Sequence, residues 1–234
     1  MEKTLTVVQE KTDTDLWIIG ISTLVVFGAY MMVQSSIDTT ISNAEHFILL
    51  RTMYGAFIQF GLTGLGITIV SIFRKEPFRQ HGLNKKNIVK SILLSILCVI
   101  PYLIFIVVTE KNVQYMPLQG VKMTKEILNS GFPVNILGIG IIALVWGFFE
   151  GFNYIVISDK INARYPSNNK WLNWGGIICT IACILLHGAI GLHVENIFEI
   201  LATLCLVYGM IMVREKTDNA WGTIFIFLFF WNAF

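Results

Sequence analysis

Long uninterrupted blocks of apolar residues constrain this chain more than any other feature. Each block is close to the roughly 20 residues that a helix needs to cross the hydrocarbon core of a bilayer. Together they make the sequence 55% hydrophobic and only 14% charged, an excess that a soluble core could not hide. A transmembrane barrel would show alternating hydrophobicity instead, so the blocks predict helices. The expected fold class is all-α, a polytopic transmembrane helix bundle.

The blocks predict about seven spans in a single membrane domain that covers residues 1–234. The predicted spans are roughly 16–34, 48–73, 88–109, 134–158, 175–192, 195–213 and 219–234. The second span contains the glycine-rich run GLTGLG, which favours tilt or close helix contact. We therefore expect a multi-pass protein of the cell membrane whose helices contact the lipid bilayer.

The distribution of lysines and arginines predicts the orientation of the spans in the membrane. Six of the seventeen fall in segment 74–90, which the positive-inside rule assigns to the cytoplasm. Thirteen of the seventeen then lie on the cytoplasmic side, and the N-terminus is cytoplasmic. Loop 110–133 is the exception, since it carries three lysines on the opposite side, but long loops follow the rule less strictly. A net charge of +2 lacks the basic field typical of nucleic-acid binding, so no nucleic-acid partner is expected.

The three informative polar side chains deep inside predicted spans are Glu150, His187 and Asn232, whereas Glu199 lies only about a turn inside its span and is expected to be a solvated or capping charge. A carboxylate at a span centre costs about 2.5 kcal/mol or more even on lenient insertion scales. At the helical rise per residue, the three lie about 12, 18 and 20 Å from the cytoplasmic ends of their spans, so they can meet in one layer. Two purely structural alternatives stay open. A protonated Glu150 could bond Asn153 and serve assembly alone, and His187 could bond a backbone carbonyl.

The surroundings of Glu150 narrow its chemistry. Gly147 and Gly151 frame it in a G-x-x-x-G pattern, which favours close helix packing and lets another backbone approach the glutamate. A catalytic zinc site needs about three protein ligands, but the chain has no H-E-x-x-H motif and only Glu150 and His187 share the layer. We therefore expect neither a metal nor a cofactor.

The three polar residues stand in short motifs whose order is informative. Segment Glu150–Ile155 keeps the first glutamate and an aromatic of E-E-x-x-F-R, and Cys183–His187 keeps the histidine of F-x-x-x-H. Segment Leu228–Asn232 follows Trp221 and keeps the asparagine of H-x-x-x-N. In order and depth these motifs resemble those of the CAAX-protease and bacteriocin-processing family of intramembrane endopeptidases. The resemblance covers about residues 78–234.

The resemblance implies an endopeptidase that cleaves a membrane-associated peptide or protein at the cytoplasmic side. It makes Glu150 the base that activates water, His187 its partner or an oxyanion donor, and Asn232 a second oxyanion donor. The second glutamate, the arginine and the second histidine of the motifs are missing, which predicts slow or absent activity. Two alternatives remain: a catalytically weak or inactive relative acting in binding or bacteriocin immunity, and a small ion-coupled transporter that relays ions or protons through Glu150 and His187.

Overall fold

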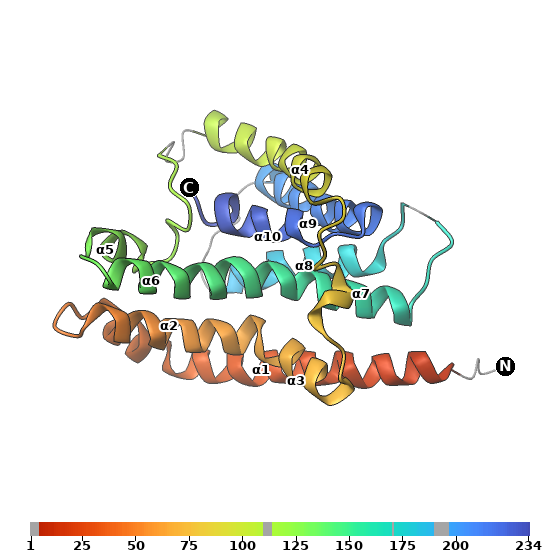
Figure 1. The fold of residues 1–234 in the computed structure, drawn as a ribbon, viewed down its shortest axis with the longest axis horizontal. Helices are drawn as coiled ribbons and strands as arrows, with labels where there is room; N and C mark the ends of the chain where they lie inside the picture. Colours follow the sequence, from red (N-terminus) through yellow and green to blue (C-terminus); the bar gives the residue numbers. More distant parts are fainter. Residues whose placement is uncertain (1–4, 110–113, 170, 190–196) are drawn as a thin grey trace. The chain divides into compact units, whose positions relative to one another are not determined.

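The structure is a computed structural model that describes residues 5–109, 114–169, 171–189 and 197–234 (Figure 1). Every regular element in these ranges is helical, so the predicted all-α fold class is confirmed. The elements in chain order are α1 (Val7–Ser42), α2 (Ile48–Thr63), α3 (Leu65–Arg74), the 3₁₀ turn η1 (Phe78–His81), α4 (Ile88–Val108), α5 (Thr124–Asn129), α6 (Val134–Ile142), the π-helical η2 (Ala143–Phe149), α7 (Glu150–Arg164), α8 (Trp174–Ala189), α9 (Ile197–Thr217), α10 (Trp221–Ile226) and the π-helical η3 (Phe227–Trp231).

Several of these helices are long and apolar enough to cross a bilayer, as a membrane protein requires. Four pass on length and composition: Val7–Ser42, Ile88–Val108, the continuous run Val134–Arg164, and Ile197–Thr217. Helices α2 and α3 make a fifth if the bent pair counts as one span. Two shorter apolar helices, Trp174–His187 and Trp221–Trp231, overlap the two remaining predicted spans, 175–192 and 219–234. The number of seven spans stays a prediction. Residues 190–192 of predicted span 175–192 and residues 195–196 of predicted span 195–213 lie outside the described residues.

The glycine-rich run predicted for close contact lies at the bend between α2 and α3. The two helices meet at 58° around Gly64. A Cβ placed on Gly66 would lie 2.8 Å from the backbone Cα of Ile19, and one on Gly61 would lie 2.9 Å from a methyl carbon of Val26. Larger side chains at these positions would push α1 away, so the prediction of close helix contact is confirmed.

The chain divides into two compact units. Unit one consists of the described parts of Met1–Trp17, Lys75–Val113 and Tyr154–Thr223, and unit two of Ile18–Arg74, Gln114–Asn153 and Ile224–Phe234. The division falls within helices α1, α7 and α10. Each unit is described below by itself.

Unit one is built on helix α9, which packs against α4 and α8. Small residues allow the close approach: a Cβ on Gly209 of α9 would lie 2.7 Å from the Sγ of Cys98 in α4. Helix α4 begins after Asn87, which adopts a left-handed backbone conformation with φ of 59°, a region that asparagine tolerates better than most residues. The turn before it relies on Gly82, with φ of 91°, whose missing side chain leaves room for the backbone nitrogen of Ala220.

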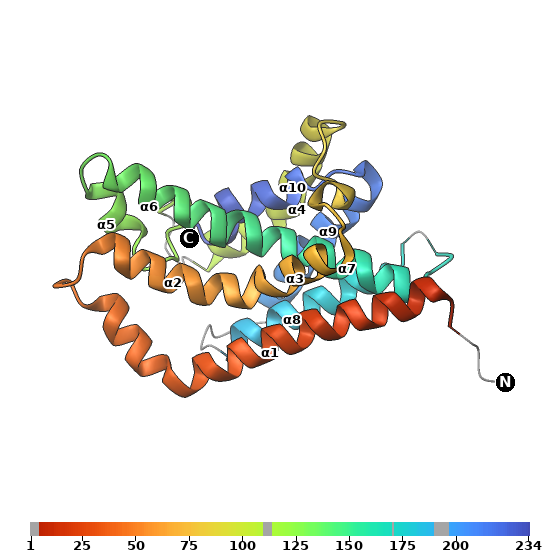
Figure 2. The ribbon, with the colours of Figure 1, turned by 60° about the horizontal axis from the view of Figure 1, so that its bottom comes forward.

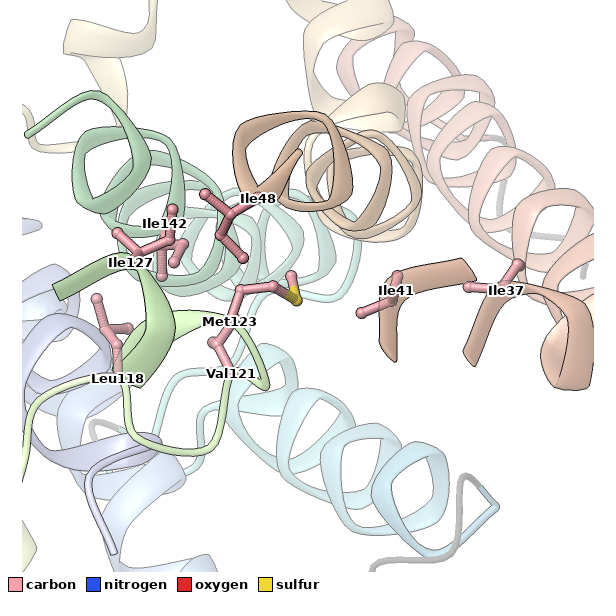
Figure 3. Close-up of a cluster of buried hydrophobic side chains, with 8 residues drawn as sticks. All are labelled: Ile37, Ile41, Ile48, Leu118, Val121, Met123, Ile127 and Ile142. Carbon is pink, nitrogen blue, oxygen red and sulfur yellow. The ribbon is translucent and has the colours of Figure 1, made fainter. Parts of the chain in front are cut away.

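Unit two is organised around helices α2 and α6, which lie side by side in both views (Figure 1 and Figure 2). Its core is a cluster of buried aliphatic side chains contributed by α1, α2, α5, α6 and the segment before α5. Figure 3 shows its eight members: Ile37, Ile41, Ile48, Leu118, Val121, Met123, Ile127 and Ile142. Residues of the predicted loop 110–133 therefore take part in this core.

Segment 114–129 is folded against the chain end within unit two. The backbone N–H of Met116 donates to the carbonyl of Ala233 at 3.1 Å, and that of Gly120 donates to the carbonyl of Asn232 at 2.9 Å. Leu118 is buried and adopts φ of 58°, an unusual conformation for a branched residue that its packing compensates. These bonds fix the position of the backbone that carries Asn232.

Candidate functional site

Glu150 is the first residue of α7 and follows directly after the π-helical segment η2. Only 5% of its surface is exposed. A π-helical segment adds a residue to the turn and shifts the side chains that follow it, and such segments are frequent at functional sites. Glu150 thus occupies the position where the apolar helix Val134–Arg164 changes register.

Neutral side chains hold the Glu150 carboxylate. The amide Nε2 of Gln59, on α2, donates to its Oε2 at 2.9 Å, and the indole N–H of Trp231, at the end of η3, donates a second side-chain hydrogen bond. Neither Gln59 nor Trp231 carries a charge. Asn153, the partner that the sequence offered as an alternative, is not among the described partners of Glu150. A carboxylate can accept about four hydrogen bonds, so these two donors leave acceptor capacity for a water or a substrate.

Small residues let η3 approach the helix that carries Glu150. A Cβ on Gly147 would lie 2.8 Å from the Cγ of Leu228, and one on Gly151 would lie 2.9 Å from a ring carbon of Phe227. The contact between η2 and η3 confirms the close packing predicted for the G-x-x-x-G pattern. It also brings Trp231 within reach of Glu150.

Aromatic rings surround the turn before and after Glu150. Phe148 stacks on Phe152 with ring centroids 5.4 Å apart, and Phe149 meets Phe60 edge-on at 4.9 Å. Phe152 is fully buried. Glu150 therefore lies in a largely apolar stretch, and its burial strengthens the hydrogen bonds that it accepts.

Asn232 follows Trp231 directly, and its side-chain amide is a hydrogen-bond donor in unit two without an acceptor among the described residues. Its backbone carbonyl accepts the bond from Gly120, but its side-chain Nδ2 is buried and finds no acceptor among the described residues. A buried amide without an acceptor costs about 1–3 kcal/mol, so such a group points to a missing partner such as a water or a bound ligand. This amide can therefore donate to an oxygen atom that comes within reach.

His187 lies in the last turn of α8 and is half-buried. It belongs to unit one, whereas Glu150 and Asn232 belong to unit two. The structure therefore places two of the three predicted residues in the same unit, and the partnership of Glu150 with His187 stays a prediction. Within the described ranges no group of three His, Cys, Asp or Glu side chains is arranged to hold a metal ion.

A second buried polar cluster, which the sequence did not single out, lies in unit one. Lys160 donates to Asp15 and to Glu76, each at 2.7 Å. Asp159 binds the Nδ1 of His81 at 2.8 Å and also accepts from Arg214 at 2.9 Å. Each carboxylate of this cluster thus has a basic partner, and we name these residues the unit-one ion-pair network.

Gln59 and Trp231 were missed as site residues by the sequence analysis. A glutamine in the apolar run of α2 is a weak signal in itself, because amides also bond between membrane helices. Its partner is 91 residues away in the chain, and no local pattern connects the two.

The chain is not matched by any protein-family model, and no curated protein and no solved structure matches it.

Proposed function

We propose that this protein is an intramembrane endopeptidase, similar to the CAAX-protease and bacteriocin-processing enzymes, that cleaves a membrane-associated peptide or protein by glutamate-activated water. The observation that carries the proposal is the buried Glu150, held by neutral donors at a π-helical break and followed in the same unit by the unpaired amide of Asn232. A base and a donor for an oxyanion are the two groups that hydrolysis of a peptide bond most needs.

In the proposed step the Glu150 carboxylate takes a proton from water while the water oxygen bonds to the peptide carbonyl carbon. The carbonyl oxygen becomes an oxyanion, which the Nδ2–H of Asn232 stabilises. When the C–N bond breaks, Glu150 returns the proton to the leaving nitrogen, so that the products are an acid and an amine. Gln59 and Trp231 act as positioning residues, because they fix the carboxylate without neutralising it.

The proposed substrate side is the cytoplasm, and the N-terminus is proposed to lie there as well. The support is the distribution of basic residues, six of which cluster in segment 74–90. The resemblance to the family implies that His187 acts as the partner of Glu150 or as an oxyanion donor, and we include this role in the proposal.

One observation favours a second candidate, a non-catalytic relative that binds a peptide or a membrane protein, for instance in bacteriocin immunity. Leu228 stands where the family motif has its second histidine, and its side chain packs against Gly147, one turn before Glu150. An aliphatic residue at this place removes one oxyanion donor, which commonly costs about 100-fold or more in rate.

The decisive experiment compares wild type with Glu150→Gln, using the purified full chain in lipid nanodiscs and fluorescent peptides tethered to the membrane surface. The exchange keeps the shape of the side chain and removes the base. Glu45→Gln is the matched control, since Glu45 is exposed in the α1–α2 turn and the chemical change is the same. We expect Glu150→Gln to lower cleavage by about 100-fold or more and Glu45→Gln to leave it unchanged.

The two candidates separate on the same assay. Equal cleavage by Glu150→Gln and wild type would refute the proposed mechanism. Absence of cleavage by wild type, with binding of the same peptide without its membrane tether that Glu150→Gln abolishes, would favour the binding relative. The variant Leu228→His sharpens the distinction, because an added donor raises the rate of an enzyme and has no rate to raise in a binding protein.

A further inference from the structure

Segment 75–90 of unit one carries the densest group of basic side chains in the chain. Its five cations are Lys75, Arg79, Lys85, Lys86 and Lys90, and all five are exposed. None of them makes a side-chain hydrogen bond or ion pair with another residue that the structure describes. The group thus presents its full positive charge to the surroundings.

The single acidic residue of the same segment, Glu76, offsets this charge only in part. Glu76 accepts a hydrogen bond from Lys160 at 2.7 Å, as part of the unit-one ion-pair network. The segment therefore carries five exposed cations against one carboxylate, whose described partner Lys160 comes from another element.

Hydrogen bonds hold the backbone of the segment in one shape. The amide of Asn84 donates to the carbonyl of Asp218 at 2.8 Å, and that of Asn87 donates to Thr217 at 3.0 Å. In return, the amide of Asn219 bonds the carbonyls of Asn84 and Lys86. A surface fixed in this way loses little conformational entropy when it binds a partner.

The cations continue directly into a lipid-facing stripe on α4. Lys86 lies in the turn before α4 and Lys90 in its first turn, and the exposed side chains of the following turns of α4 are all large and apolar. The exposed fractions of Val89, Leu93, Leu97, Ile100 and Ile104 range from 44% to 69%. A change from cations to exposed aliphatic residues along one helix marks the level where headgroups give way to acyl chains.

We propose that segment 75–90 is a binding surface for anionic phospholipid headgroups, formed by these five cations at the membrane end of α4. A polybasic segment beside a span attracts acidic lipids with about 1 kcal/mol per cation near the surface. Fixed cations above a lipid-facing stripe suit a molecule that offers both a phosphate and acyl chains. This inference does not depend on the proposed peptidase activity.

The test measures the association of spin-labelled phosphatidylglycerol, relative to spin-labelled phosphatidylcholine, with the full chain in phosphatidylcholine vesicles. Wild type is compared with Lys85→Gln/Lys86→Gln. The control Lys122→Gln/Lys125→Gln removes two exposed lysines of unit two and so makes the same change in net charge. We expect the first variant to lose about 30-fold of the preference for phosphatidylglycerol, which corresponds to about 1 kcal/mol for each removed cation, and we expect a smaller preference at high salt. The control variant should keep the wild-type preference.

Four outcomes would overturn the proposal. The first is equal preference in wild type and Lys85→Gln/Lys86→Gln, and the second is an equal loss in the control variant, which would indicate an effect of net charge alone. The third is displacement of the labelled lipid by inorganic phosphate at equal ionic strength, which would assign the site to a free anion. The charge-preserving variant Lys85→Arg/Lys86→Arg must retain the preference, and its failure to do so would also contradict the proposal.

Discussion

The two units hold their buried carboxylates in opposite ways. In unit one, Asp15 and Glu76 share Lys160, and Asp159 has both His81 and Arg214 as partners. In unit two, Glu150 is buried to a similar degree as Asp15 but accepts hydrogen bonds from the neutral side chains of Gln59 and Trp231. A neighbouring cation stabilises the ionised form of a carboxylate. Neutral donors add no opposite charge, so such a carboxylate can still take up a proton from water.

This difference separates charged residues with a structural explanation from those that are candidates for chemistry. A carboxylate with a basic partner is explained by the pair, which holds elements together or specifies their arrangement. Glu150 has no such explanation among the described residues, and the cost of its burial is met by two weaker bonds. The unpaired amide of Asn232 in the same unit strengthens the contrast. This contrast supports the proposed role of Glu150, whereas the unit-one ion-pair network has a structural explanation.

The largest effect is expected from removing the shared cation of unit one. Lys160→Met leaves Asp15, which is 1% exposed, and Glu76 without their common partner. Breaking a buried pair by removing one member typically costs about 3–5 kcal/mol. The free energy of unfolding, measured by detergent-induced denaturation of purified protein and followed by circular dichroism, should fall by about that amount.

The double variant Asp15→Asn/Lys160→Met is the control for this prediction. It removes the buried charge together with its cation, so it should recover more than half of the lost stability. A loss below about 1 kcal/mol in Lys160→Met would mean that the network is not structural. The contrast between the two units would then disappear.

A smaller effect is expected where neutral donors hold the carboxylate. Gln59→Leu removes one of the two bonds to Glu150, and a hydrogen bond to a buried polar group is worth about 1–3 kcal/mol. The same unfolding measurement should show this loss, and cleavage should fall as well because the carboxylate is no longer fixed. In the background Glu150→Leu, Gln59→Leu should cost clearly less, since the bond is already absent. Equal costs in both backgrounds would contradict the assigned role of Gln59.

The sequence predicted the helices and the polar residues, but not what connects them. Glu150 is visible because a charge interrupts an apolar block, and the packing at Gly147 follows from its spacing to Gly151. The π-helical form of η2 and η3 has no comparable local signal in the sequence, and the two segments are in contact with each other. Likewise the bond from Gln59 joins residues 91 positions apart. Tertiary contacts, not propensity, decide these features.

The packing of η3 against η2 gives the next prediction, with an effect of about 1 kcal/mol. A methyl group on Gly147 must displace the Leu228 side chain, which is a flexible neighbour, so overpacking costs less here than against backbone. Gly140→Ala is the matched control, since nothing lies within 4 Å of its added carbon in the same helical run. Alanine is the better helix former, so the control should be neutral or slightly stabilising. Combining Gly147→Ala with Leu228→Ala should relieve the overlap; equal behaviour of Gly147→Ala and Gly140→Ala would contradict the close approach.

The smallest effect is expected for the exposed ion pair of unit two, which completes the comparison between buried and solvated charges. Lys122 donates to Asp38 at 2.8 Å, with side chains 59% and 41% exposed. Water screens such a pair, so Lys122→Gln should change the free energy of unfolding by less than about 1 kcal/mol, and by still less at high salt. Arg51→Gln is the counterpart in the same unit: the Arg51 side chain is 7% exposed and bonds both Glu126 and the carbonyl of Ile41. Its loss should exceed that of Lys122→Gln several-fold, because burial rather than the mere presence of a partner sets the strength of these interactions. Similar losses in the two variants would show that burial does not rank the charges of this protein.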